Sequence, residues 1–149
     1  MQVSVKIKDY DKLVKAFNKA PKEVVKRTER AVAQSVFLVE SNAKKLAPVN
    51  KQSGGGNLRQ SIRAIPKGTT GLVDVGAKYA VPVHEGTRPH IIRAKAKKVL
   101  ADRRNGKFFG KVVNHPGTKA QPFLREAVEK SNRRINNFFS EIFKGIIKL

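Results

Sequence analysis

The sequence contains no cysteine among its 149 residues. This absence excludes a disulfide framework and zinc sites built from cysteine, and it suits a protein assembled in a reducing cytoplasm. Acidic residues are also scarce, because 32 Lys and Arg side chains face only 11 Asp and Glu, which gives a formal net charge of +21. A charge of this size repels other copies of the chain and attracts polyanions, so we expect an acidic partner.

Long apolar runs are missing as well. No run approaches the roughly 18 residues that a membrane helix needs, and the first ten residues lack the apolar core of a signal peptide. We therefore expect a soluble chain that is not exported and has no membrane partner. The 40% content of hydrophobic residues is enough to form a core at this length, so we expect one domain spanning residues 1–149.

Two long segments have the spacing of helices. Between residues 22 and 46 apolar or small side chains recur every three to four positions, and Pro48 ends the pattern. Residues 120–143 repeat this spacing through Leu124, Val128 and Ile135. A shorter helix is expected after Asp9 or Asp11, because either side chain can cap a helix start.

Short strands are expected outside these helices. Residues 3–7 alternate apolar and polar side chains, residues 62–66 and 72–75 flank a turn that contains glycine, and residues 91–93 resume an extended form. Residues 47–57 contain three consecutive glycines and predict a mobile loop. This order predicts an α+β fold, in which a small antiparallel sheet packs against both long helices.

The positive charge is concentrated outside the helices. Residues 91–119 carry 9 basic side chains and 1 acidic side chain. Within this stretch, residues 91–113 predict a basic hairpin or loop, with residues 97–100 and 107–113 paired around Asn105-Gly106. The partner of this stretch is either an acidic protein or DNA, and a solvated arm without a partner is the plain alternative. The candidate partner contacts are Arg93, Lys95, Lys97, Lys98, Arg103, Arg104, Lys107 and Lys111.

The three histidines, His84, His90 and His115, offer the best case for catalysis or metal binding. Each stands beside Gly or Pro in a predicted turn, where hydrogen bonding to the backbone is a commoner role. Glu85 alone is too little to complete a metal site, and no Lys-Ser/Thr follows the glycine run, as a phosphate loop requires. We therefore expect no catalytic, cofactor-binding or metal-binding residues. A small nuclease that uses a histidine pair is a weak alternative.

A general nucleic-acid-binding protein is the stronger alternative, because the basic excess would give salt-dependent affinity for phosphates. The sequence contains no zinc finger, ribonucleoprotein motif or evident helix-turn-helix that would read bases. Phe108 and Phe109 are the aromatic residues near the basic stretch, and packing in a core or an interface is their plainest interpretation. Specific nucleic-acid binding is therefore not expected.

Three further motifs follow one another along the chain. They are Gly56-Asn57-Leu58-Arg59-Gln60-Ser61-Ile62, Tyr79-Ala80-Val81-Pro82-Val83-His84-Glu85-Gly86-Thr87 and His115-Pro116-Gly117-Thr118-Lys119-Ala120-Gln121-Pro122-Phe123-Leu124. Together with the long helix before them and the helix after them, these motifs resemble the tail-component family of siphophages. The loop before Gly56 and the Val83-His84-Glu85 triplet depart from the usual residues of that family.

The resemblance implies a structural virion protein of a long-tailed phage, with no catalytic activity and no cofactor. It implies a neck or tail-completion subunit that forms a ring, with a hexamer expected, and that joins or terminates the tail at the head. The implied partners are further copies of the chain, head-closure or connector proteins, the tail tube protein and, without specificity, DNA in the channel. The implied location is the virion, after assembly in the host cytoplasm. Structural roles are implied for Gly86, Thr87, Pro116, Gly117, Pro122, Phe123 and Leu124.

Overall fold

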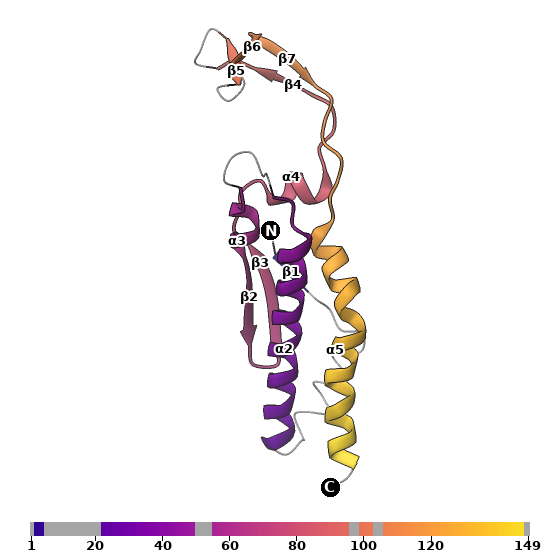
Figure 1. The fold of residues 1–149 in the computed structure, drawn as a ribbon. Coiled ribbons are helices and arrows are strands. Elements are labelled where there is room, and N and C mark those ends of the chain that lie inside the picture. Colours follow the sequence, from indigo (N-terminus) through magenta and orange to yellow (C-terminus); the bar gives the residue numbers. More distant parts are fainter. Residues whose placement is uncertain (1, 5–21, 50–54, 96–98, 103–105, 148–149) are drawn as a thin grey trace. The chain divides into compact units, whose positions relative to one another are not determined.

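The computed structural model describes residues 2–4, 22–49, 55–95, 99–102 and 106–147 (Figure 1). The chain divides into two compact units. Unit 1 comprises Met1–Ala80 and Pro122–Leu149, and unit 2 comprises Val81–Gln121. One domain spanning residues 1–149 stays a prediction.

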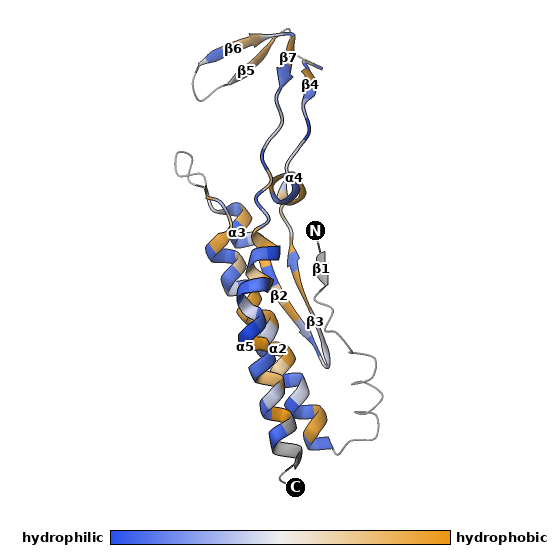
Figure 2. Cartoon of the chain, turned by 90° about the vertical axis from the view of Figure 1, so that its right-hand side faces the viewer, coloured by the Kyte–Doolittle hydropathy of each residue, from blue (hydrophilic) through white to orange (hydrophobic). Residues whose placement is uncertain are grey.

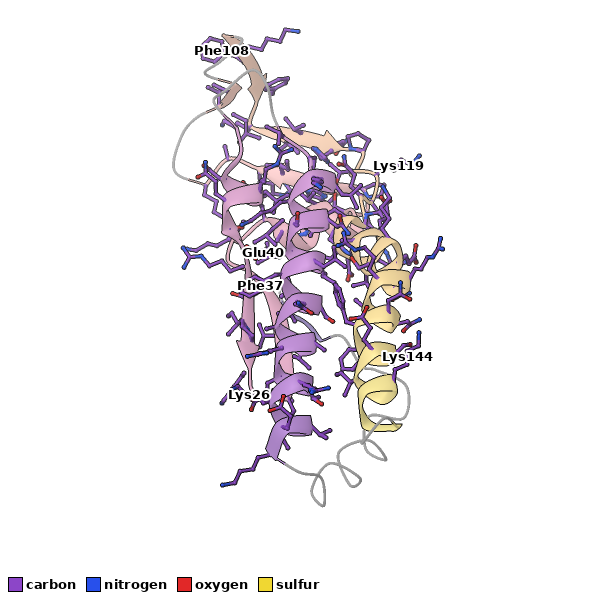
Figure 3. All side chains as sticks on the ribbon, turned by 60° about the horizontal axis from the view of Figure 1, so that its bottom comes forward. Lys26, Phe37, Glu40, Phe108, Lys119 and Lys144 are labelled. Atoms are coloured by element: carbon purple, nitrogen blue, oxygen red, sulfur yellow. The ribbon has the colours of Figure 1, made fainter. Side chains whose placement is uncertain are left out.

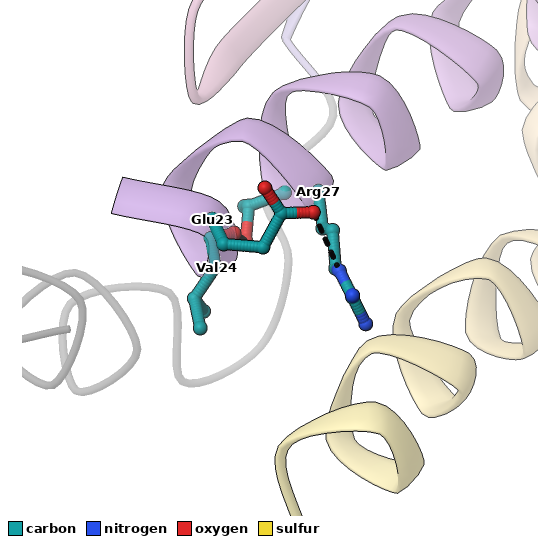
Figure 4. A network of polar contacts seen from close by, with 4 residues as sticks. Glu23, Val24 and Arg27 are labelled. Atoms are coloured by element: carbon teal, nitrogen blue, oxygen red, sulfur yellow. Dashed lines mark hydrogen bonds and ion pairs between the residues drawn. The ribbon is translucent and has the colours of Figure 1, made fainter. Parts of the chain in front are cut away.

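The first long helix of unit 1, α2, spans Lys22–Leu46 and confirms the predicted segment. Glu23 lies in its first turn, where a negative charge stabilises the helix dipole, and Lys44 and Lys45 lie in its last turn. Arg27 Nε donates to Glu23 Oε1 at 3.2 Å, one turn apart on an exposed face (Figure 4). The opposite face is buried through Val24, Thr28, Ala31, Val32, Ser35, Val36, Val39 and Ala43.

The second long helix, α5, spans Phe123–Ile147, so it begins three residues later and ends four residues later than predicted. Its start is set by Pro122, whose carbonyl accepts the Glu126 N–H at 3.0 Å, because proline suits the first turn of a helix. In unit 1, α2 and α5 run antiparallel (Figure 1), as Val24 packs in one cluster with Ile142. Figure 2 shows the alternation of hydrophobic and hydrophilic residues along both helices.

A polar contact joins the two helices near the C-terminal end of α2. Asn42 Nδ2 donates to Ser131 Oγ at 2.9 Å, and Ser131 is fully buried. Ser131 Oγ in turn donates to the Ala127 carbonyl at 2.6 Å. Because a buried hydroxyl requires a partner, this contact fixes the register of α2 against α5.

A three-stranded antiparallel sheet completes unit 1, in the order β1-β3-β2. These strands span Gln2–Ser4, Thr70–Val75 and Ile62–Lys67, and the short helix α3 (Asn57–Ser61) precedes β2. The sheet packs closely on α2 at Gly71, where an added Cβ would lie 2.7 Å from Val36 Cγ1. The predicted α+β fold is confirmed.

Some details of unit 1 differ from the sequence-based expectations. The β2–β3 turn is tighter than predicted, because β2 extends to Lys67 and β3 starts at Thr70, with Gly68 at a φ of +57°. The short helix α3 before β2 was not predicted. The helix expected after Asp9 or Asp11 lies outside the described residues, as does the middle of the predicted loop over residues 47–57.

Unit 2 contains most of a short helix and four short strands. Helix α4 spans Ala80–Glu85 and was not predicted. Strand β4 (His90–Arg93) pairs antiparallel with β7 (Val112–His115), and β5 (Leu100–Asp102) pairs antiparallel with β6 (Lys107–Gly110). Gly110, the last residue of β6, has a φ of +80°, and Lys111 separates β6 from β7. Val112 and Val113 pair with β4 and not with residues 97–100 as expected. None of the described helices is long and apolar enough to cross a membrane.

Candidate partner-binding arm

Two segments of unit 2, residues 86–89 and 116–120, lie side by side and form what we name the stem. Thr87 and Thr118 each donate a backbone N–H to the carbonyl of the other, at 3.0 and 3.1 Å. Their hydroxyl groups lie 3.0 Å apart, and the Thr118 N–H also reaches Thr87 Oγ1 at 3.0 Å. The Gln121 N–H donates to the Val83 carbonyl at 3.0 Å. The two segments are therefore held together by backbone and side-chain bonds at one point.

Two glycines permit this close approach. A Cβ at Gly86 would lie 2.6 Å from the Thr118 carbonyl oxygen, and a Cβ at Gly117 would overlap the Thr87 carbonyl oxygen. Both residues also have a positive φ, +76° for Gly86 and +89° for Gly117, which other residues rarely adopt. No other residue type fits at either position without moving the backbone.

The stem brings together four of the residues to which the resemblance gives structural roles: Gly86, Thr87, Pro116 and Gly117. The other three lie at the start of α5 in unit 1. There Pro122 immediately precedes the helix, and Phe123 and Leu124 are buried, with 2% and 1% of their surfaces exposed.

The histidines take up separate positions. His90 and His115 face each other across β4 and β7, with ring centroids 4.9 Å apart in a stacked arrangement. His90 Nδ1 donates to the Arg88 carbonyl at 2.9 Å, and His115 Nδ1 accepts the Gly117 N–H at 3.0 Å. Hydrogen bonding to the backbone, the role that the sequence predicts, is confirmed for these two residues. His84 lies in the last turn of α4 and is buried.

The four strands of unit 2 form the arm, which we define as residues 90–115. Among the arm residues whose burial is described, none is buried. The exposed side chains include Phe108 at 76% and Phe109 at 50%, so the interpretation that these two pack in a core is wrong, and interface packing stays a prediction. Figure 3 marks Phe108 among the side chains of the chain. The other large apolar side chains that the arm exposes are Ile91, Ile92, Val99 and Val112.

The same arm carries the predicted basic contacts. Arg93 lies at the end of β4, Lys95 follows it, Lys107 opens β6, and Lys111 stands between β6 and β7. All four side chains are exposed. The Lys111 carbonyl accepts the Ala94 N–H at 2.9 Å, which extends the pairing of β4 and β7 by one bond. The remaining four candidates, Lys97, Lys98, Arg103 and Arg104, lie outside the described residues.

Arg93 shares one face of the β4–β7 pair with apolar side chains. Strand side chains alternate between faces, and Arg93 is directly opposite Val112, while Ile91 is opposite Asn114. Ile91, Arg93 and Val112 therefore project on the same side, and all three are exposed. This face combines apolar surface with positive charge, which the sequence interpretation did not identify.

The described part of the chain contains no group of three or more His, Asp or Glu side chains that could hold a metal ion. What the arm offers chemically is a surface for a partner, with cationic side chains beside apolar ones.

Comparison with known proteins adds one finding. The HK97-gp10-like family model, described as "Bacteriophage HK97-gp10, putative tail-component", matches residues 11–88. This match covers slightly more than half of the 149 residues and includes α2, the β2–β3 hairpin, α4 and the first residues of the stem. The arm and α5 follow the matched segment. No curated protein and no solved structure matches the chain.

Proposed function

The chain belongs to the HK97-gp10-like family of bacteriophage tail components, and on this basis we propose that it is a neck or tail-completion subunit that joins or terminates the tail at the head. The family accounts for the coarser role: the chain is a structural protein of a phage tail, located in the virion, where it contacts other tail or head proteins. The finer role is supported by the arm, because a surface of exposed apolar and cationic side chains suits a protein that connects two assemblies.

In this role the subunit works as a hexameric ring. Unit 1 supplies a folded scaffold, since α2 packs against both α5 and the sheet. The charge of +21 per copy opposes self-association at low ionic strength, so ring formation requires salt or an acidic partner surface. Electron microscopy of virions tests this proposal through the density at the neck. A neck without rotationally repeated copies of this chain would refute the ring.

The basic side chains of the arm contact the partner in this proposal. We expect the double variant Lys107→Glu and Lys111→Glu to melt at nearly the wild-type temperature, because exposed charges contribute about 0–1 kcal/mol each. The same variant should fail to join heads to tails. The matched control reverses Lys26 and Lys144, two exposed lysines on α2 and α5 (Figure 3), and should give normal particles.

Normal infectious particles from the arm variant would show that these lysines form a passive surface. Loss of joining in both variants would instead mean that total charge matters and that its position does not. Electron micrographs that count joined particles distinguish these outcomes, while circular dichroism monitors the helices of each variant.

The proposed role includes no catalysis. His90 and His115 each have a structural role that requires no catalysis, because their Nδ1 atoms are hydrogen-bonded to the backbone. We expect that alanine at any one of the three histidines removes no activity from the purified chain. Degradation of RNA or DNA by the wild type, lost in one of these variants, would overturn this part of the proposal.

Non-specific binding of nucleic acid is the second candidate function, and the exposed cations of the arm favour it. Its signature would be an affinity for duplex DNA that falls steeply with added salt, because each phosphate contact releases counterions. Fluorescence anisotropy with a 30-base-pair duplex over a series of salt concentrations measures this dependence. A virion role and DNA affinity are compatible, so the neck density decides the first candidate independently.

A further inference from the structure

We propose that the arm docks on an acidic protein surface that has an apolar centre. This inference rests on the proposed function, because it takes the partner to be another structural protein of the virion. It goes further by assigning the chemistry of that partner, which the positive charge alone leaves open between protein and DNA.

Several large apolar side chains of the arm are exposed. Phe108, Ile91, Phe109 and Val112 are 76%, 56%, 50% and 47% exposed, within a segment of only 26 residues from 90 to 115. Two-stranded sheets are marginally stable in water unless a further layer covers an apolar face. Ile91 and Val112 lie on one face of the β4–β7 pair, and apolar side chains that gather on an exposed face mark an interaction site. The arm therefore has the composition of half an interface.

The arm exposes two kinds of side chain, cationic and apolar, and duplex DNA and a protein surface differ in which of them they can contact. A duplex presents phosphates, which cations such as Arg93 and Lys111 satisfy, but aliphatic side chains such as Ile91 gain nothing from a phosphate backbone. Phenylalanine rings stack readily on the bases of single strands, whereas in a duplex they reach the bases only after a base step is unstacked, which costs about a few kcal/mol per step. Duplex DNA would thus use the charge of the arm and leave its apolar side chains in water. An acidic protein surface with an apolar centre satisfies both kinds of side chain, in the arrangement typical of protein interfaces.

The charge of the arm disfavours a second copy of this chain as its partner. Two arms would bring like charges together, and residues 91–119 alone carry 9 basic side chains and 1 acidic side chain. The helices do not compensate for this charge, because α2 and α5 together carry 11 basic side chains and 6 acidic ones. Charge complementarity therefore favours a different protein, with an excess of Asp and Glu around its apolar centre.

The test uses the full chain with a fluorophore on a single cysteine. Because the sequence has no other cysteine, Gln34→Cys on the exposed face of α2 gives one defined label far along the sequence from the arm. The probes are heads and tails purified from phage that lack the gene for this chain, and a 30-base-pair DNA duplex. Co-sedimentation with the particles and anisotropy with the duplex give the two dissociation constants.

Two arm variants separate apolar from electrostatic contacts. Ile91→Ser combined with Phe108→Ser should raise the Kd for heads or tails about tenfold or more, since burying even part of two such side chains is worth that factor. The same variant should leave the Kd for the duplex unchanged. Lys107→Glu combined with Lys111→Glu should weaken both interactions and reduce their salt dependence.

Two controls guard against loss of folding. Phe37→Ser removes an aromatic side chain of comparable exposure, 52%, from α2 in unit 1 and should leave particle binding unchanged. Ile91→Leu combined with Phe108→Leu keeps apolar surface at both tested positions of the arm and should retain most of the binding that the double serine variant loses. Equal loss in the leucine and serine variants would mean that the serine effect reports misfolding, and the docking surface would be rejected.

Several results would overturn the inference. Unchanged particle binding in the Ile91→Ser and Phe108→Ser variant would leave a polyanion contact only, whereas tight duplex binding without binding to heads or tails would make DNA the partner. Self-association that the apolar variant abolishes, with particle binding retained, would make a second copy the occupant. In all three cases neck density for the chain in virions would still support the proposed function, and absence of that density would refute the function itself.

Discussion

Replacing Gly117 by alanine should open the stem of unit 2. At this position the φ is +89°, and an added Cβ would overlap the Thr87 carbonyl oxygen and lie 3.0 Å from the Arg88 carbonyl carbon. Every one of these neighbours is backbone, so no side chain can rotate away to make room. The residue that replaces glycine must therefore push apart the two segments that Thr87 and Thr118 hold together.

The size of the effect follows from two contributions. A positive φ costs a residue with a Cβ about 1–2 kcal/mol, and overpacking costs about 1–3 kcal/mol more. The closed stem should therefore lose about 2–5 kcal/mol of free energy relative to the open one. A matched variant isolates the first contribution, because Gly106 also has a positive φ, +63°, with no atom within 4 Å of its Cβ position. Gly106→Ala should therefore cost only the free energy of a positive φ, about 1–2 kcal/mol, with no contribution from overpacking.

Amide hydrogen exchange at Thr87 and Thr118 measures the opening directly, since both N–H groups are bonded across the stem. A loss of 2 kcal/mol corresponds to exchange about 30 times faster at both amides in Gly117→Ala. Gly106→Ala should leave these two amides at the wild-type rate, and the exchange of the α2 and α5 amides should be the same in all three proteins. If Gly117→Ala and Gly106→Ala gave the same rates at Thr87 and Thr118, the reasoning from close approach would be wrong.

Two further predictions concern the core of unit 1. Gly71→Ala should lower the free energy of unfolding by about 1–3 kcal/mol in urea, because its Cβ would lie 2.7 Å from Val36 Cγ1, whereas Gly76→Ala, with no neighbour closer than 3.9 Å, should be nearly neutral. Ser131→Ala should cost about 1–3 kcal/mol by thermal denaturation, because it leaves the part-buried Asn42 amide without its 2.9 Å partner. Asn42→Ala should then cost less in the Ser131→Ala background than in the wild type, and strictly additive effects would refute the coupling.

The sequence predicted those elements whose evidence is local. The bounds of α2 agree at both ends because 25 residues of regular spacing stop two positions before Pro48. The β2–β3 hairpin was also predicted, since its strands flank a glycine turn. Helix α4 escaped prediction because Pro82 lies within its six residues and suggests a break. That proline stands in the first turn, where its missing N–H has no helical partner in any case.

The arm was harder to predict, for physical reasons. The pairing of His90 with His115 joins residues that are far apart in the chain. It also depends on the chain direction after Gly110, whose positive φ no sequence pattern predicted. The exposure of Ile91 and Val112 could not be predicted either, because a strand has the same sequence pattern whether or not another layer covers it. The concentration of positive charge was visible in the sequence, and its combination with apolar side chains on one face required the strand register.

Unit 2 is one continuous insertion in the sequence of unit 1, since Ala80 and Pro122 both belong to unit 1. The ends of the insertion are close together, as the hydrogen bond from the Gln121 N–H to the Val83 carbonyl at 3.0 Å requires. A segment closed in this way can be lengthened, shortened or exchanged without altering the side chains that pack α2 against α5. Recombination between related phages could therefore replace the whole arm in a single event and give a tail protein a new neighbour, while its helical scaffold is inherited unchanged.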